Sequence, residues 1–253
     1  MKKFIITRIG IDFPNKDQTG IHKIEDSDYT SKTVVDMLDF TYSSIINQTT
    51  KDIVWVFYVG QRFTEAHQKM IEEIVEIPVI FIRDIEYKSA PKQWEKEESI
   101  VLRLDADDYM HPTLIEKIEK NLLAKYNGKN IVIANPVKGF KFYPDFSLTE
   151  FQAPSIAIAQ GVISNCGAGV LHDHTKLVET FQKQFQGKEI IKNNIETDER
   201  LYLYRRHENA HSFVCESGYE KKEKISNSEK ILDEFGVTKT LFWKKHKEHN
   251  EIR

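Results

Sequence analysis

The fold of this chain is decided by one stretch of sequence, Ile100-Val101-Leu102-Arg103-Leu104-Asp105-Ala106-Asp107-Asp108-Tyr109-Met110-His111-Pro112. It begins with a nearly continuous apolar run, continues with three carboxylates, and ends on a proline that opens a helical pattern. Continuous apolar runs of this length are typical of strands that are covered on both faces. The stretch therefore predicts a buried strand over 99–104, an acidic turn, and a helix over 112–126.

Strands and helices alternate on either side of this stretch. The apolar patterns predict helices over 33–46 and 64–77, strands over 4–9, 53–59, 79–82 and 131–134, and a loop with a short helix over 86–98. This order predicts an α/β fold with a mostly parallel central sheet flanked by helices. In such sheets ligands bind beyond the carboxyl ends of the strands, which is where the acidic turn stands.

The second half of the chain is less regular. Its patterns predict a helix over 174–186 and strands over 140–143, 155–163 and 200–206. We expect one domain over 1–218, with a regular half at 1–135 and a less regular half at 136–218. Residues 219–253 are rich in Lys and Glu and predict a charged helical tail. The tail either docks its apolar side on the body or makes a weak contact with an anionic membrane surface.

Composition excludes several classes of protein. The 253 residues carry 36 Lys+Arg and 39 Asp+Glu, a formal charge of −3, whereas general nucleic-acid binders carry a basic excess. Two cysteines, Cys166 and Cys215, are too few for a disulfide framework. No apolar run approaches the roughly 20 residues of a membrane span, and the run that ends at Ile6 is too short for a signal peptide. We therefore expect a cytoplasmic protein.

The acidic turn predicts a cation site. Carboxylates at positions i and i+2 of an extended segment project to the same side, so Asp105 and Asp107 converge. Two carboxylates that are this close need a shared proton or a cation between them. Mg²⁺ and Mn²⁺ suit such oxygen ligands together with diphosphate oxygens, and they assist the departure of a phosphate leaving group. Alternatively, an acid before a proline caps the following helix, which would fully explain Asp108.

The segment from Leu104 to Pro112 resembles the Asp-x-Asp segment of GT-A glycosyltransferases. Arg103-Leu-Asp-x-Asp-Asp, with Thr7-Arg8 at the end of the first strand, is similar to a bacterial rhamnosyltransferase group. The resemblance covers about residues 3–135. It implies a GT-A-like single domain that moves a sugar from a UDP-, GDP- or dTDP-linked donor to a hydroxyl of a carbohydrate acceptor, in bacterial surface polysaccharide or glycolipid synthesis. Residues 1–135 would then be the nucleotide-binding half and 136–218 the acceptor half.

The same resemblance assigns roles to individual residues. Thr7, Arg8 and Asp84 would lie near the nucleotide. The candidates for contact with the diphosphate are Arg62, Lys88, Lys92 and Arg103, each of which could instead be a solvated surface charge. An arginine buried at position 103 would need a carboxylate partner, either Asp105 or Asp107.

The third metal ligand and the catalytic base would come from the second half. The segment 203–212 resembles a strand followed by a His, which implies His207 as a metal ligand, with His211 as the other candidate. Arg205 and Arg206 could hold phosphate oxygens. The cluster His172-Asp173-His174 either ligates a metal or caps a helix. Inverting sugar transfer needs a carboxylate base, for which Asp173 and Asp198 are the candidates, beside Asp145, Glu196 and Glu199.

Two other functions compete with this one. A nucleotidyltransferase also uses carboxylates and Mg²⁺, but it needs a Gly-rich basic loop after the first strand, which Gly10-Ile11-Asp12-Phe13-Pro14 matches poorly. A non-catalytic binding or scaffold protein of the same fold has no need of the convergent pair Asp105 and Asp107. In the glycosyltransferase interpretation, the tail would place the cytoplasmic protein at the inner face of the membrane.

Overall fold

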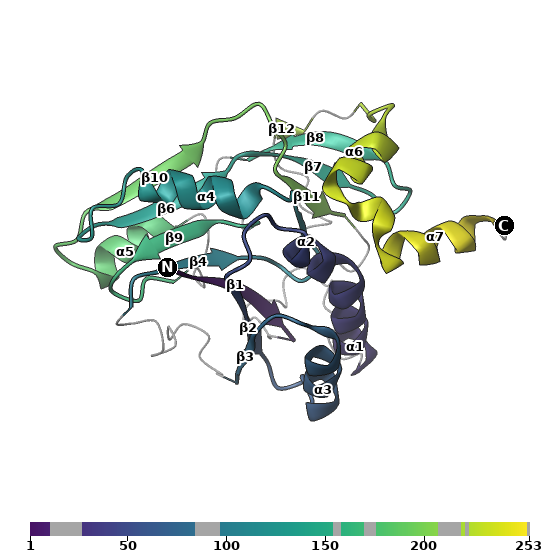
Figure 1. Cartoon of the computed structure of the whole chain (residues 1–253), viewed down its shortest axis with the longest axis horizontal. Helices are drawn as coiled ribbons and strands as arrows, with labels where there is room; N and C mark the ends of the chain where they lie inside the picture. Colours follow the sequence, from purple (N-terminus) through teal and green to yellow (C-terminus); the bar gives the residue numbers. More distant parts are fainter. Residues whose placement is uncertain are drawn as a thin grey trace, which may run out of the picture.

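The computed structural model of the chain describes residues 1–10, 27–83, 97–153, 158–169, 176–206, 219–220 and 223–251. The chain forms two β-sheets with helices packed around them (Figure 1). Within the described residues, no helix is both long and apolar enough to cross a membrane.

The larger sheet has seven strands in the order β10-β6-β9-β4-β1-β2-β3. All its strands run in the same direction except β9, which is antiparallel to both of its neighbours. The expected α/β fold with a mostly parallel central sheet is therefore confirmed. The strands are β1 (Lys2–Ile9), β2 (Ile53–Val59), β3 (Val79–Ile82), β4 (Ser99–Arg103), β6 (Ile131–Pro136), β9 (Gly161–Ser164) and β10 (Ile190–Ile195).

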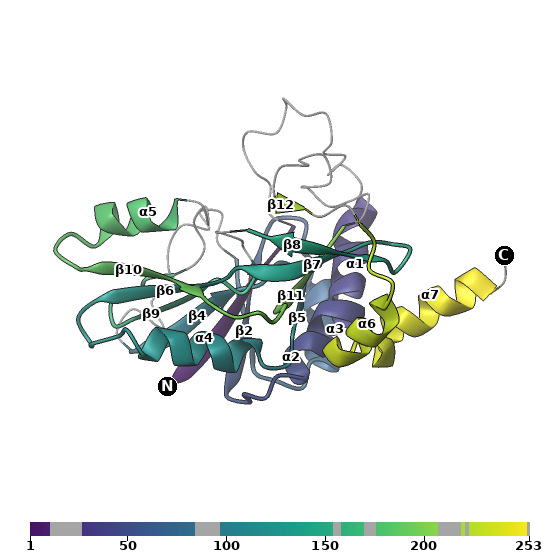
Figure 2. The ribbon, with the colours of Figure 1, turned by 90° about the horizontal axis from the view of Figure 1, so that it is seen from above.

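Helices cover both faces of this sheet, which is why its strands read as continuous apolar runs. In β4, Ile100 and Leu102 belong to the core on one face, whereas Val101 belongs to the core on the other. Figure 2 shows α4 and α5 on opposite sides of the sheet. One face packs against α1 (Ser27–Asp36), the π-helical turn η1 (Met37–Thr41), α2 (Tyr42–Ile46), α3 (Glu65–Ile74) and α4 (Leu114–Leu123), and the other against α5 (Leu177–Gln184).

The smaller sheet has five strands in the order β12-β8-β7-β11-β5. They are β5 (Tyr109–Met110), β7 (Lys138–Phe142), β8 (Leu148–Gln152), β11 (Tyr202–Arg205) and β12 (Tyr219–Glu220). Of these, β5, β8 and β12 were not expected from the sequence, and neither was β10 at the edge of the larger sheet. The expected strand 155–163 is shorter than predicted, because β9 begins at Gly161 after a turn at Ile158 and Ala159.

The C-terminal region contains α6 (Ser228–Phe235), the 3₁₀ turn η3 (Val237–Lys239) and α7 (Leu241–Glu251). Its apolar residues Leu232, Phe235, Val237 and Phe242 are buried in an aromatic cluster on the smaller sheet. This part of the tail therefore packs on the body, although the far end of α7 points away from it (Figure 1). The division of the chain at residue 218 remains a prediction, since Tyr219 and Glu220 pair with β8 and so join the smaller sheet to the tail.

The two sheets meet at the acidic turn, which we define as Leu104–Asp108. It leaves β4 of the larger sheet and enters β5 of the smaller sheet. The Leu104 N–H donates to the Ile6 carbonyl at 2.9 Å, and the Asp108 N–H donates to the Asp105 carbonyl at 3.3 Å. The acidic turn thus stands at the carboxyl ends of β1 and β4, where the sequence predicted it.

Candidate active site

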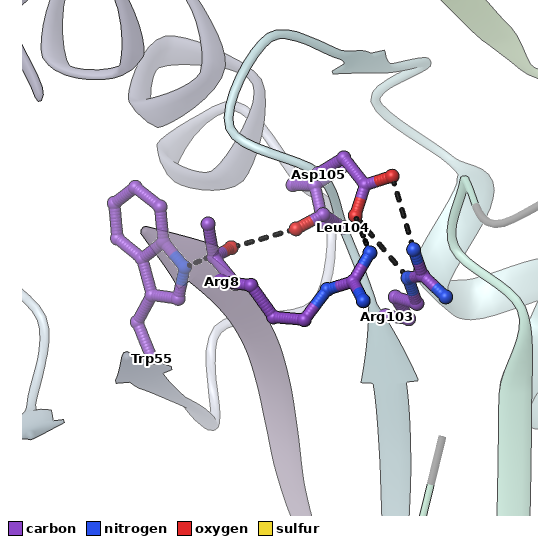
Figure 3. A network of polar contacts seen from close by, with 6 residues as sticks. Arg8, Trp55, Arg103, Leu104 and Asp105 are labelled. Atoms are coloured by element: carbon purple, nitrogen blue, oxygen red, sulfur yellow. Dashed lines mark hydrogen bonds and ion pairs between the residues drawn. The ribbon is translucent and has the colours of Figure 1, made fainter. Parts of the chain in front are cut away.

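The carboxylate of Asp105 lies between two arginines (Figure 3). One oxygen is 3.5 Å from Arg8 Nη2 and 3.2 Å from Arg103 Nε, and the other accepts a hydrogen bond of 3.3 Å from Arg103 Nη2. The Arg103 side chain is only 7% exposed, whereas that of Asp105 is 32% exposed. The expectation that a buried Arg103 takes a neighbouring carboxylate is confirmed, and Asp105 is that carboxylate.

Asp107 is the other partly exposed acid of the acidic turn. Its charge acts on Tyr29 of α1. Burial raises the pKa of the Tyr29 phenol, and the charge on Asp107 raises it further. The charge on Asp107 also helps to raise the pKa of Asp108. Asp105 and Asp107 thus both stand in the acidic turn at the carboxyl ends of the strands, and the convergence of their carboxylates remains a prediction.

Asp108 points into the protein rather than toward the helix that follows. The residue is 1% exposed, and burial, reinforced by the charges of Asp107 and Asp105, raises the pKa of its carboxyl group well above the ordinary value. The backbone N–H of Arg205 donates to this carboxyl group, while Oδ1 is buried without a hydrogen-bond partner among the described residues. The interpretation of Asp108 as a helix cap is therefore wrong, because β5 intervenes and α4 has Thr113 at its N-cap.

Thr7 is fully buried directly beside the acidic turn. Its hydroxyl donates to the Leu104 carbonyl at 2.8 Å and accepts a hydrogen bond of 2.9 Å from the Trp55 indole N–H. With no exposed surface to offer a nucleotide, Thr7 contributes here by tying β1 and β2 to the residue before Asp105.

Arg62 lies in the turn that follows β2, on the same sheet edge as Arg8. The Gly60 N–H donates to the carbonyl of Ile9 at 2.9 Å, which holds this turn against the end of β1. Arg62 is partly buried, and its Nη1 has no hydrogen-bond partner within the described part of the chain. A buried guanidinium nitrogen without a partner is costly, so an anion at this edge would stabilise it.

Arg205 and Arg206 follow each other at the end of β11 but have different surroundings. Arg205 Nη1 is 3.1 Å from Asp36 Oδ2, and its guanidinium lies 4.5 Å from the Phe242 ring centroid. The Arg205 guanidinium thus joins α1 and α7 to β11, and the expectation that it holds phosphate remains a prediction. Arg206 is 4% exposed and lies 5.7 Å from the Tyr204 ring centroid.

Asp198 is not brought to the acidic turn. It precedes β11, whose opposite end at Arg205 lies beside Asp108. Its exposed carboxylate is 3.0 Å from Lys138 Nζ, which lowers its pKa. The Asp198 carboxylate is thus an exposed partner of Lys138 at the end of β11 away from Asp108, and its role as the base remains a prediction.

Nine residues that the sequence singled out lie outside the described residues: Asp84, Lys88, Lys92, His172, Asp173, His174, His207, His211 and Cys215. Among the residues that are described, no group of three His, Cys, Asp or Glu side chains could hold a metal ion. A metal site at the acidic turn would therefore need a ligand from the substrate, from water or from one of these segments.

Sequence reasoning missed Thr41. Its buried hydroxyl donates to the Ala106 carbonyl at 2.8 Å, inside the acidic turn. The sequence placed Thr41 in the middle of an ordinary helix, and no local pattern marks it as different from the other polar residues there.

No family model matches the sequence, and no curated protein matches it either. Among solved structures, the chain is similar to S. aureus TarS 1-349, with a TM-score of 0.43 and 10% identity over 81% of this chain and 60% of that chain. For TarS 1-349 in complex with UDP-GlcNAc, the TM-score is 0.42 and the identity 12% over 87% of this chain and 62% of that chain. For the complex with UDP, the TM-score is 0.39 and the identity 11% over 81% of this chain and 60% of that chain. The chain spans about three fifths of the length of these TarS chains. What it does is therefore inferred from its own site.

Proposed function

We propose that this chain is a metal-dependent glycosyltransferase of the GT-A type, which moves a sugar from a nucleoside diphosphate to a hydroxyl acceptor. The observation that supports this proposal best is the set of charged residues at the acidic turn. The partly exposed acids Asp105 and Asp107 and the arginines Arg8 and Arg103 lie at the carboxyl edge of a mostly parallel sheet. Ligands bind at that edge in α/β sheets.

The acids of the acidic turn have different roles in this proposal. Asp105 is already paired with Arg8 and Arg103, so it would ligate a cation only by sharing its carboxylate with them. Asp107 is the principal cation ligand, because its partly exposed carboxylate is an oxygen donor of the kind that Mg²⁺ and Mn²⁺ prefer. When bound, such a cation neutralises the charge that develops on the diphosphate as the donor bond breaks.

The arginines supply the anion-binding part of the site. Arg8 and Arg103 are held by Asp105 at the end of β1 and β4, and Arg62 lies on the neighbouring turn. Guanidinium groups bind phosphate oxygens through paired N–H donors, so these three residues would orient the diphosphate. Arg206 contributes from the smaller sheet.

The remaining roles rest on the resemblance. His207 would complete the cation site, Asp173 would take the proton from the acceptor hydroxyl, and Asp84 and Lys92 would lie near the nucleotide. The donor would be linked to UDP, GDP or dTDP, with Mn²⁺ or Mg²⁺. The acceptor would be a carbohydrate of a bacterial surface polysaccharide or glycolipid. The protein would be cytoplasmic, with a weak membrane contact through α7.

Thermal unfolding tests this proposal directly. Mn²⁺ together with UDP, GDP or dTDP should raise the melting temperature of the wild type, because a ligand that binds the folded state stabilises it by about 2.7 kcal/mol at 100 times its Kd. Asp107→Asn should lose this shift. Asp52→Asn, an exposed carboxylate at the amino end of β2, is the matched control and should keep it.

Two results would count against the proposal. If no nucleoside diphosphate shifts the melting temperature with Mn²⁺, the glycosyltransferase interpretation is wrong. A larger shift with nucleoside triphosphates than with diphosphates would favour the nucleotidyltransferase alternative.

A further inference from the structure

Two buried threonine hydroxyls hold the acidic turn from opposite sides. Thr7 donates to the carbonyl of Leu104 at 2.8 Å, and Thr41 donates to the carbonyl of Ala106 at 2.8 Å. Both threonines are 0% exposed. These two carbonyls flank Asp105, one on each side along the chain.

Each of these carbonyls belongs to the peptide group that precedes an acid. A peptide group is planar, so fixing its carbonyl oxygen also fixes the N–H of the next residue. Thr7 thereby fixes the peptide group entering Asp105, and Thr41 fixes the one entering Asp107. The pair of hydrogen bonds fixes the two peptide planes that lead into the acids.

The hydroxyl of Thr7 has a single orientation available. It accepts a hydrogen bond of 2.9 Å from the Trp55 indole, and its one proton is then directed to Leu104. Trp55 is fully buried in β2, so the donor cannot swing away. The hold on Leu104 is thus anchored in the core of the larger sheet.

Thr41 departs from the usual behaviour of a hydroxyl inside a helix. Such hydroxyls commonly bond back to a carbonyl of their own helix, as Thr33 does to Tyr29 at 2.9 Å and Ser44 does to Thr41 at 2.7 Å. The Thr41 hydroxyl instead crosses to the acidic turn, 65 residues further along the chain.

The helix is distorted at the position that makes this crossing. Met37–Thr41 form a π-helical turn between α1 and α2, closed by the N–H of Tyr42 donating to the carbonyl of Met37. Single π-helical turns are rare and concentrate at functional sites. Thr41 is the last residue of this turn, and its hydroxyl is the one that reaches Ala106.

We propose that Thr7 and Thr41 are positioning residues that hold Asp105 and Asp107 in the arrangement that binds a divalent cation. The inference rests on the proposed function, because it assigns the two hydroxyls to the cation site. Neither threonine touches the cation or the substrate. Both act through the backbone of the acidic turn.

The test uses two readouts on the full chain. The first is amide hydrogen exchange of residues 105–108, referenced to the amides of β2. The second is the affinity for Mn²⁺ alone, measured calorimetrically. Thr41→Val keeps the shape of the side chain and removes its hydroxyl, and Thr41→Ser keeps a hydroxyl at this position. Thr7→Val removes the hydroxyl that donates to the Leu104 carbonyl.

Thr240→Val is the matched control. The Thr240 hydroxyl is buried, donates to the Val237 carbonyl at 2.8 Å and accepts from the backbone N–H of Trp243 at 3.1 Å, so like Thr7 it both donates and accepts, but away from the acidic turn. It should lower stability without changing either readout.

We expect Thr41→Val to speed exchange in the acidic turn by about 3- to 10-fold, the factor to which one lost hydrogen bond corresponds, and to weaken Mn²⁺ binding similarly. Thr41→Ser should restore both. If Thr7→Val does not fold, the two Thr41 variants decide the question alone.

Unchanged exchange and unchanged Mn²⁺ affinity in Thr41→Val would overturn the inference, and so would equal changes in Thr240→Val. Faster exchange with unchanged affinity would show that the hydroxyls are structural only, which also overturns it. If the wild type binds no Mn²⁺, the proposed cation site fails and the inference with it. Exchange then still reports whether the hydroxyls hold the acidic turn.

Discussion

The acidic turn has a front and a back with opposite environments. The front, Asp105 and Asp107, is partly exposed, and Asp105 is paired with arginines from β1 and β4. The back, Asp108, is buried together with Tyr109 of β5, which packs against β11 and the tail. Asp105 and Asp108 are three residues apart, yet the Asp105 carboxylate is paired with arginines, whereas burial disfavours the charged form of Asp108.

This difference teaches how the two halves of the chain share the site. The charged front is built by β1, β2 and β4 of the larger sheet, with Thr7 and Trp55 behind it. The back is closed by aromatic residues from both halves of the chain, among them Phe40, Phe140 and Phe235. The acidic turn joins the two sheets, so its front and its back can be perturbed separately.

The largest effect should come from opening the back. Phe235 is 2% exposed, and its ring centroid lies 6.4 Å from that of Tyr109 and 5.0 Å from that of His111. Phe235→Ala should lower the free energy of unfolding by about 3–5 kcal/mol, because it leaves a cavity in the aromatic cluster.

Leu241→Ala is the control for this change. Leu241 lies in the same tail and is 53% exposed, so its truncation should change stability by less than about 0.5 kcal/mol. Urea unfolding measures both variants. Equal effects would mean that the tail does not support the acidic turn.

The next effect should come from the front. Asp105→Asn removes the charge that faces the buried guanidinium of Arg103, and we expect it to lower stability by about 1–3 kcal/mol. Glu97→Gln breaks the exposed ion pair with Lys2 and should cost less than about 1 kcal/mol. If Asp105→Asn and Glu97→Gln are equally stable, the pairing of Asp105 with Arg103 does not stabilise the front.

The corresponding substitution at the back, Asp108→Asn, should raise the free energy of unfolding, whereas Asp105→Asn lowers it. Burial raises the pKa of Asp108, so between its ordinary pKa and the raised one the folded protein binds this proton more tightly than the unfolded chain does. The stability of the wild type therefore declines as the pH rises through that range. Asp108→Asn does not titrate, so its stability relative to the wild type should increase with pH and the difference should vanish in acid.

Urea unfolding of both proteins between pH 4 and pH 8 measures this difference. A stability difference that stays constant over the whole range would show that Asp108 carries the same charge in the folded and unfolded states.

The smallest effect concerns the contact of the tail with α2. Gly236 ends α6 at φ +83°, and a Cβ there would lie 3.2 Å from Asn47 Nδ2. Gly187 has φ +84° with nothing within 4 Å of such a Cβ. Both Gly→Ala changes should cost about 1 kcal/mol through backbone strain, with a few tenths more at Gly236. Thermal unfolding of the pair detects the difference, and a larger loss at Gly187 would contradict the close approach of α6.

Much of the larger sheet could be predicted from the sequence, because strands buried on both faces leave an unmistakable apolar run. The strands at 53–59 and 79–82 have the expected bounds. In contrast, β5 is two residues long and directly follows the acidic turn, and β10 is an edge strand of mixed polarity. Neither of them leaves a pattern of its own.

The site could be predicted where its residues are neighbours in the chain. Arg103 and Asp105 sit at one strand end, so the need of a buried arginine for a carboxylate was enough to pair them. Thr41 and Ala106 are 65 residues apart, and Thr41 lies in a π-helical turn that no residue pattern announces. The contacts of Arg205 with Asp36 and Phe242 could not be predicted either, because these partners are far from it in the sequence.

The central claim is that the front of the acidic turn binds a divalent cation together with a nucleoside diphosphate. Calorimetric titration of the wild type and Asp107→Asn with UDP, GDP and dTDP, each with and without Mn²⁺, tests this most directly. We predict that Mn²⁺ tightens the binding of one nucleotide to the wild type by about 10-fold or more, and that Asp107→Asn loses this coupling. A nucleotide Kd that Mn²⁺ leaves unchanged in the wild type, or changes equally in both proteins, would contradict the claim.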